Sequence, residues 1–255
     1  MITSKDNEKL KLARKLQRRR HRDRERLFVT EGEDLLEAGL SAGVDPVALV
    51  TLQGEGLGGE EATADALASA STLGSGTRAI AIWRQSWSPV AGPVCVYLEG
   101  VSDPGNVGAI VRSAHALVEG AVVIGPDTAD PFSPKAVRAT MGSIFGQALA
   151  RASIEETPRP RTALVAHGGR PLADLALYSP YAGEKRHSAD PASLTQPQTL
   201  TLCLGSERTG LPPEALSECD SEVTIPLREG GAESLNVAAA AAIALQRISS
   251  EAAGA

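Results

Sequence analysis

The chain lacks the segments that would carry it into or across a membrane. No run of 18 or more apolar residues occurs in its 255 residues, and the first residues are polar and basic, unlike an export signal. Hydrophobic residues make up 42% and charged residues 22%, which is ordinary usage for globular proteins. We therefore expect a cytoplasmic protein with one large or two modest domains and no membrane partner.

Metal-binding patterns are missing as well. Cys95, Cys203 and Cys219 lie far apart and form no CxxC pair, and the four histidines share no ligand spacing. The sequence thus predicts no metal site and a reducing compartment. Each cysteine is interpreted as a small core or edge residue, because no neighbouring motif would lower its pKa.

The phosphate-loop motif of many nucleotide hydrolases is also lacking. No G-x-x-x-x-G-K-[ST] segment occurs in the sequence. Nucleotide hydrolysis therefore loses its usual support.

Positive charge is concentrated at one end. Residues 1–26 hold eleven Lys and Arg against four Asp and Glu, although the whole chain has a net charge of −6. Leu10, Leu12 and Leu16 among these charges suggest an exposed basic helix. Such a block can bind an RNA backbone by releasing counterions. A solvated helix face is the alternative, and charge alone does not separate the two.

The pattern of apolar segments predicts a division near residues 83–93, where two prolines interrupt the periodicity. We expect a basic extension over 1–26, a small α/β domain over 27–88 and a second domain over 94–252. In the first part, a strand is expected at 47–52 and a helix at 60–70.

The second part alternates strands with helices. Strands are expected at 94–98, 121–124, 163–166, 200–204 and 223–227, and helices after residue 106 and at 133–146 and 235–248. This alternation indicates an α/β fold with a parallel sheet covered on both faces. Residues 178–198 are expected to form a surface loop.

Three glycine-containing turns follow or border these strands, at the place where open α/β sheets bind ligands. The first has the pattern N-x-G-x-x-x-R from Asn106 to Arg112, and the second has G-x-E-x-x-G from Gly205 to Gly210. The third contains Gly230 and Gly231 and ends in S-L-N-V from residue 234. Each turn also has a simpler interpretation. Asn106 and Ser234 could be helix N-caps, and Glu207 could balance the neighbouring arginine.

In this order the three turns resemble the three motifs of the SpoU or TrmH class of the SPOUT methyltransferases. The segment 133–143 is similar to the family segment that carries a second functional arginine, here Arg138. Residues 26–32 resemble the start of the L30e-like substrate-binding domain that often precedes this catalytic domain.

The resemblance implies a C-terminal trefoil-knotted α/β domain with a parallel sheet, preceded by a small L30e-like α/β domain. It also implies a homodimer that binds S-adenosylmethionine and RNA. By the family pattern, the cofactor contacts are Leu204, Gly205, Ile225, Leu235 and Asn236; the catalytic residues are Arg112, Asn106, Glu207, Ser234 and Asn236; and Arg138 and Arg112 bind the substrate.

The implied activity is methyl transfer to a ribose 2′-hydroxyl of ribosomal or transfer RNA, with ribosomal RNA slightly favoured. We expect Arg112 to favour alkoxide character on that hydroxyl electrostatically. It is not expected to act as the base, because a guanidinium already holds its proton. A non-catalytic RNA-binding protein with the same fold and a base-methylating SPOUT enzyme are the alternatives.

Overall fold

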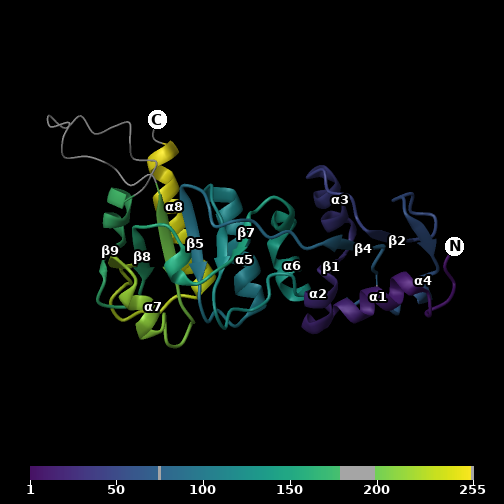
Figure 1. Cartoon of the computed structure of the whole chain (residues 1–255), viewed down its shortest axis with the longest axis horizontal. Helices are drawn as coiled ribbons and strands as arrows, with labels where there is room; N and C mark the ends of the chain where they lie inside the picture. Colours follow the sequence, from purple (N-terminus) through teal and green to yellow (C-terminus); the bar gives the residue numbers. More distant parts are fainter. Residues whose placement is uncertain (74–75, 179–198, 254–255) are drawn as a thin grey trace. The chain divides into compact units, whose positions relative to one another are not determined.

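The computed structural model describes residues 1–73, 76–178 and 199–253, which form two compact units (Figure 1). The first contains Met1–Ser86 and Asp130–Gly146, and the second contains Trp87–Ala129 and Gln147–Ala255. The loop expected over 178–198 lies outside the described residues except for Tyr178. No helix in the described part of the chain has the length and apolar character needed to cross a membrane.

The first unit is built on a four-stranded sheet in the order β1-β4-β2-β3. Its strands are β1 (Leu27–Glu31), β2 (Ala48–Leu52), β3 (Glu60–Ala62) and β4 (Ala79–Arg84). β4 is antiparallel to both β1 and β2, and β2 is parallel to β3. The helix expected over 60–70 is wrong in its first residues, which form β3. β4 was not predicted, because the division expected near residues 83–93 begins inside this strand.

Helices cover this sheet and complete its core. They are α1 (Glu8–Leu16), α2 (Arg19–Glu25), α3 (Glu33–Ser41), α4 (Ala64–Ala68), α6 (Pro134–Thr140) and the 3-10 turn η1 (Ser143–Phe145). Leu10, Ala13 and Leu16 lie on one face of α1 at helical spacing and are buried in the core. The interpretation of this region as an exposed basic helix is therefore wrong for α1.

The segment 130–146 joins the first unit through aromatic contacts. The ring of Phe132 lies 5.1 Å from that of Phe28 on β1, and the ring of Phe145 lies 4.7 Å from that of Trp83 on β4. The helix expected over 133–146 ends at Thr140, because Met141 adopts a left-handed conformation with φ of 48°.

A buried ion pair ties α2 to the same segment. Arg22 Nη2 lies 2.7 Å from Asp130 Oδ2, and both side chains are 5% exposed or less. Arg22 Nη1 also donates to the carbonyls of Leu16 and Gln17, at 2.8 and 2.9 Å. The buried charges are thus paired and hydrogen bonded, which offsets the cost of removing them from water.

Replacing Arg22 with alanine should lower the free energy of unfolding by about 3–5 kcal/mol, because Asp130 would be left charged and buried without its partner. Urea denaturation measures this loss. Arg19→Ala on the same helix is the control: Arg19 is 58% exposed and pairs loosely with Asp23, so its loss should cost about 0.5 kcal/mol or less. Equal losses in the two variants would contradict the assignment.

The second unit has a seven-stranded sheet in the order β7-β6-β5-β10-β8-β11-β9. Its strands are β5 (Val94–Leu98), β6 (Val122–Ile124), β7 (Leu149–Arg151), β8 (Arg161–Leu164), β9 (Arg170–Pro171), β10 (Leu200–Leu204) and β11 (Ser221–Thr224). Every pairing in this sheet is parallel, and every residue of β5 and β10 is buried. The predicted α/β class and parallel sheet are confirmed.

The helical segments of this unit are α5 (Pro104–Leu117), η2 (Ile154–Glu156), η3 (Leu172–Tyr178), α7 (Pro213–Ser217) and α8 (Val237–Ala253). α5 and α8 pack against each other (Figure 1). β6 and β7 lie on one side of β5, and β10, β8, β11 and β9 lie on the other. The order in which the chain adds strands to the sheet therefore reverses between β5 and β10. Ligands bind at such a reversal point in open α/β sheets.

Candidate active site

The first two motif turns lie side by side because β5 and β10 are neighbours in register. Leu98 pairs with Leu204, and the backbone N–H of Glu99 donates to the Leu204 carbonyl at 3.0 Å. The loops that follow these strands must start at the same edge of the sheet. The fold thereby brings together residues that are about a hundred positions apart in the sequence.

The first turn opens α5 with a cap that the sequence analysis did not identify. The Asp103 carboxylate accepts a hydrogen bond from the backbone N–H of Gly105 at 2.6 Å, and Pro104 occupies the first helical position. Asn106 is therefore inside the first turn of the helix and is not its cap. Its side-chain amide is available for contacts with the other motifs.

A chain of hydrogen bonds joins one residue from each of the three motifs. Asn236 Nδ2 donates to Asn106 Oδ1 at 3.0 Å, and Asn106 Nδ2 donates to Glu207 Oε1. Asn236 Oδ1 accepts from the backbone N–H groups of Ala238 and Ala239, at 2.9 and 3.3 Å, so Asn236 caps α8. This cap fixes which way the Asn236 amide faces.

Neither Ser234 nor Glu207 has the simpler structural role that the sequence also allowed. Ser234 is not the cap of α8, since the Asn236 side chain has that position. The Glu207 carboxylate accepts a hydrogen bond from Asn106, 101 positions away in the sequence, and does not simply balance the charge of its neighbour Arg208.

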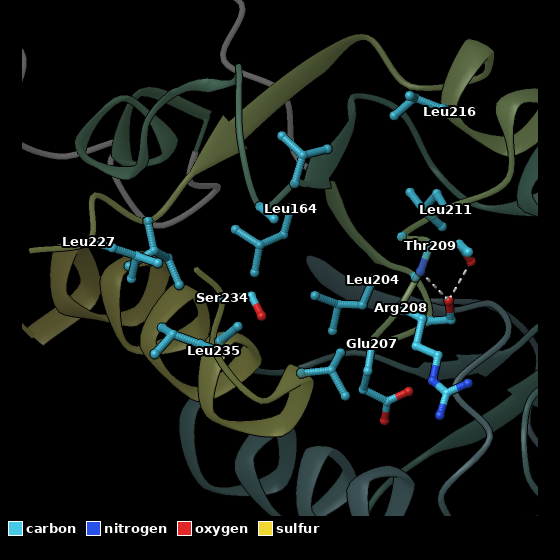
Figure 2. A pocket seen from close by; sticks show the side chains of 18 residues that line it. Leu164, Leu204, Glu207, Arg208, Thr209, Leu211, Leu216, Leu227, Ser234 and Leu235 are labelled. Atoms are coloured by element: carbon cyan, nitrogen blue, oxygen red, sulfur yellow. Dashed lines mark hydrogen bonds between the residues drawn. The ribbon is translucent and has the colours of Figure 1, made fainter. Parts of the chain in front are cut away.

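A cavity of about 310 Å³ lies beside this chain of hydrogen bonds, within the usual range for small-molecule sites. Figure 2 shows leucine side chains around it, with the hydroxyl of Ser234 and the carboxylate of Glu207 among them. The predicted site residues that line it are Leu204, Gly205, Glu207, Ile225, Ser234 and Leu235. Asn106 and Asn236 do not line it and are connected to its wall through Glu207.

The loop after β10 closes tightly on itself at the cavity wall. Ser206 and Gly210 exchange two backbone hydrogen bonds, each 3.0 Å long, and the Ser206 hydroxyl lies 2.7 Å from that of Thr209 (Figure 2). A Cβ atom on Gly205 would lie 2.0 Å from the carbonyl carbon of Gly210. Only glycine fits at this position, so the backbone itself forms that part of the wall.

The two arginines have different surroundings. Arg112 lies on α5, six positions after Asn106; its side chain is exposed, and it is not part of the cavity wall. Arg138 belongs to the other unit, where it lies on α6 and its Nη1 donates to Thr72 Oγ1 at 3.2 Å.

Some cavity residues were not identified from the sequence. Leu164 and Val165 reach the cavity from the end of β8, and Leu227 reaches it from the segment after β11. Their position at carboxyl ends of parallel strands was the available signal. Apolar residues there look like ordinary core residues in a sequence.

Two buried groups near the central strands titrate outside their normal range. Burial raises the pKa of Tyr97, and its hydrogen bond to the Glu99 carboxylate, 2.6 Å long, raises it further. Burial also raises the pKa of the Cys95 thiol. Cys95 and Cys203 are buried free thiols.

Within residues 1–73, 76–178 and 199–253, no group of three or more His, Cys, Asp or Glu residues could hold a metal ion.

The sequence pattern of the SpoU rRNA Methylase family matches residues 93–246, and that of the MRM3-like substrate binding domain matches residues 7–82. The chain belongs to the SpoU rRNA methylase family. The family resemblance seen in the three turns is thereby confirmed, as is a substrate-binding domain ahead of the catalytic one.

Two rRNA methyltransferases are similar to this chain over nearly its whole length. The 23S rRNA (guanosine(2553)-2′-O)-methyltransferase RlmP of Bacillus subtilis is 30% identical over 95% of this chain and 96% of its own length. The AdoMet-bound rRNA methyltransferase from Sinorhizobium meliloti is 29% identical, with a TM-score of 0.76 over 97% of this chain and 96% of that one.

The SpoU methyltransferase AviRb from Streptomyces viridochromogenes has a TM-score of 0.77 over 96% of this chain and 97% of its own. At 22% identity, this third likeness supports the fold alone.

Proposed function

We propose that this chain transfers a methyl group from S-adenosylmethionine to a ribose 2′-hydroxyl of ribosomal RNA. The observation that carries the proposal is the hydrogen-bonded chain from Asn236 through Asn106 to Glu207, which joins all three motifs of the SpoU class beside one cavity. Support for the substrate comes from the relative RlmP, whose name specifies 2′-O-methylation of 23S rRNA.

The cavity fits S-adenosylmethionine in its size and its walls. It has both apolar side chains, such as Leu164 and Leu235, and the backbone of Gly205 in its wall. Apolar side chains can enclose an adenine ring, and exposed backbone groups can bind its polar edge and the methionyl part. When bound, the cofactor supplies a methyl group on a sulfonium leaving group.

The chain itself must then align the ribose and stabilise charge on its oxygen. The 2′-hydroxyl loses its proton as it attacks, so a fixed cation close to the oxygen lowers the barrier. We assign this role to Arg112, which remains protonated, and the released proton goes to water or to a phosphate oxygen. Glu207, Asn106 and Asn236 hold the ribose side of the cavity in shape, and Ser234 adds a hydroxyl at its wall.

Three further expectations stay proposals. The family resemblance implies a homodimer, and a second copy would cover exposed apolar surface on α8, where Ile243 is 42% exposed. The trefoil knot is proposed on the same resemblance. We also propose a cytoplasmic location, in keeping with a ribosomal RNA substrate.

The exposed arginines at the start of α2 are proposed to bind the RNA backbone. Arg18, Arg19 and Arg20 are consecutive and exposed, in a unit whose sequence matches a substrate-binding domain. Removing residues 1–26 is a poor test, because α1 contributes to the core. Substituting the exposed cations leaves that core intact.

The triple substitution Arg18→Gln, Arg19→Gln, Arg20→Gln should weaken binding of a 23S rRNA transcript. It should also make the slope of log affinity against log salt shallower, by up to about 0.7–0.9 for each phosphate that is no longer neutralised. Filter binding between low and moderate salt measures both effects. The control is Arg78→Gln, since Arg78 already pairs with Glu33 and Glu55. An unchanged salt slope in the triple variant would refute the assignment.

A further inference from the structure

A buried carboxylate in the first unit has contacts that the catalytic site does not explain. Glu31, the last residue of β1, is 7% exposed. It accepts hydrogen bonds from the Ser71 hydroxyl at 2.7 Å, from the backbone N–H of Thr72 at 2.9 and 3.1 Å, and from the Thr72 hydroxyl at 2.6 Å. Glu31 thus fixes a loop about 40 positions further along the chain.

The Thr72 hydroxyl connects this carboxylate to Arg138. An ionised carboxylate can only accept hydrogen bonds, so the Thr72 hydroxyl must be the donor in its hydrogen bond to Glu31. The lone pairs of the same oxygen then accept from Arg138 Nη1, at 3.2 Å. The three groups form a directed chain in which the position of one guanidinium nitrogen is set by a buried carboxylate.

Arg138 otherwise keeps its binding capacity. Of its five N–H donors, only those of Nη1 have a hydrogen-bond partner within the described parts of the chain. The side chain is half-buried on α6, in the unit that contains the substrate-binding domain. An arginine held at one nitrogen and open at the others is suited to take a phosphate bidentately, with less loss of conformational entropy.

We propose that Glu31 and Thr72 are positioning residues, which hold Arg138 in the orientation that binds an RNA phosphate during methyl transfer. The inference rests on the proposed function. It assigns the substrate-binding domain a second task, because the end of β1 and the 71–72 loop would then orient an arginine that the sequence places within the methylase region.

The variant Thr72→Val isolates this role. It removes the hydroxyl but keeps the shape of the side chain and the backbone N–H that binds Glu31. Thr72→Ser restores a hydroxyl, and Ser71→Ala removes a different hydroxyl from the same carboxylate without a contact to Arg138. Thermal melting of each variant establishes that the fold is retained.

The measurement is methyl transfer to an unmodified 23S rRNA transcript, with kcat and KM for the RNA determined separately. Thr72→Val should lower kcat/KM about five- to tenfold, mainly through KM, with an unchanged affinity for S-adenosylmethionine. Thr72→Ser and Ser71→Ala should stay within about twofold of the unsubstituted protein.

A double-mutant cycle with Arg138→Gln separates positioning from general stability. Once Arg138 is replaced, Thr72→Val should cause no further loss, because there is no guanidinium left to position. An equal loss in both backgrounds, or no loss with Arg138 present, would overturn the inference. Failure of the unsubstituted protein to methylate the transcript would overturn the proposed function, and the inference with it.

Discussion

Replacing Arg112 with alanine is expected to lower kcat for methyl transfer by at least about a hundredfold to a thousandfold. The guanidinium would stabilise negative charge that develops on the ribose oxygen only during the transfer, so its loss acts on the chemical step. Arg112 is exposed and lies outside the cavity wall, so the affinity for S-adenosylmethionine should stay within a few-fold. Single-turnover transfer and calorimetric titration measure the two quantities.

Arg112→Lys serves as the matched control. Lysine keeps the charge but loses the planar, two-pronged geometry, so this variant should recover only part of the activity. A fully active Arg112→Ala variant would rule out the assigned role. A loss of cofactor affinity as large as the loss of rate would show that Arg112 acts in binding.

Replacing Gly205 with alanine is expected to abolish measurable cofactor binding, which means a loss of at least about a hundredfold in affinity. The added Cβ would lie 2.0 Å from the carbonyl carbon of Gly210 and 2.1 Å from the backbone N of Leu211. These are backbone atoms, so the closed loop must open and the cavity wall must change shape. Calorimetric titration with S-adenosylmethionine measures the loss, and urea denaturation shows whether the fold remains.

Gly210→Ala is the control in the same loop. Gly210 has φ of +69°, but a Cβ there would meet no atom within 4 Å. Its substitution should cost about 1–2 kcal/mol of backbone strain and leave cofactor affinity within a few-fold. If Gly205→Ala binds the cofactor as Gly210→Ala does, the Gly205 backbone is not part of the binding surface.

The catalytic half of the fold could be predicted because its signals are local. β5 is a continuous apolar run, and β10 is apolar except for Thr201. Each is followed by a turn whose glycines and polar residues are typical of the family. The order of the three turns identifies the family. The family in turn implies that Asn106, Glu207 and Asn236 lie close together, and the hydrogen bonds join these three side chains.

The first unit was harder to predict because its contacts are distant in sequence. The division into 1–26, 27–88 and 94–252 follows the order of the chain and stays a prediction. The structure groups 130–146 with the N-terminal residues through the pair of Arg22 with Asp130, 108 positions apart. Nothing local in either segment indicates that pairing.

The basic N-terminal region illustrates how charge can obscure a core helix. Eleven cations in 26 residues dominate the pattern, but Leu10, Ala13 and Leu16 are spaced three residues apart and form a narrow apolar face. An alanine in the middle of that face carries little hydrophobic signal. The same limit applies to Thr72, because no sequence feature connects it to Glu31 or Arg138.

The most direct test of the proposed function is tritium transfer from labelled S-adenosylmethionine to an unmodified 23S rRNA transcript, followed by digestion to nucleosides. We expect the label in a single 2′-O-methylated nucleoside, and alkaline hydrolysis should leave its 3′ phosphodiester bond uncut. Label on a base would contradict ribose methylation. Cofactor binding without transfer to ribosomal or transfer RNA would instead indicate a non-catalytic RNA-binding protein.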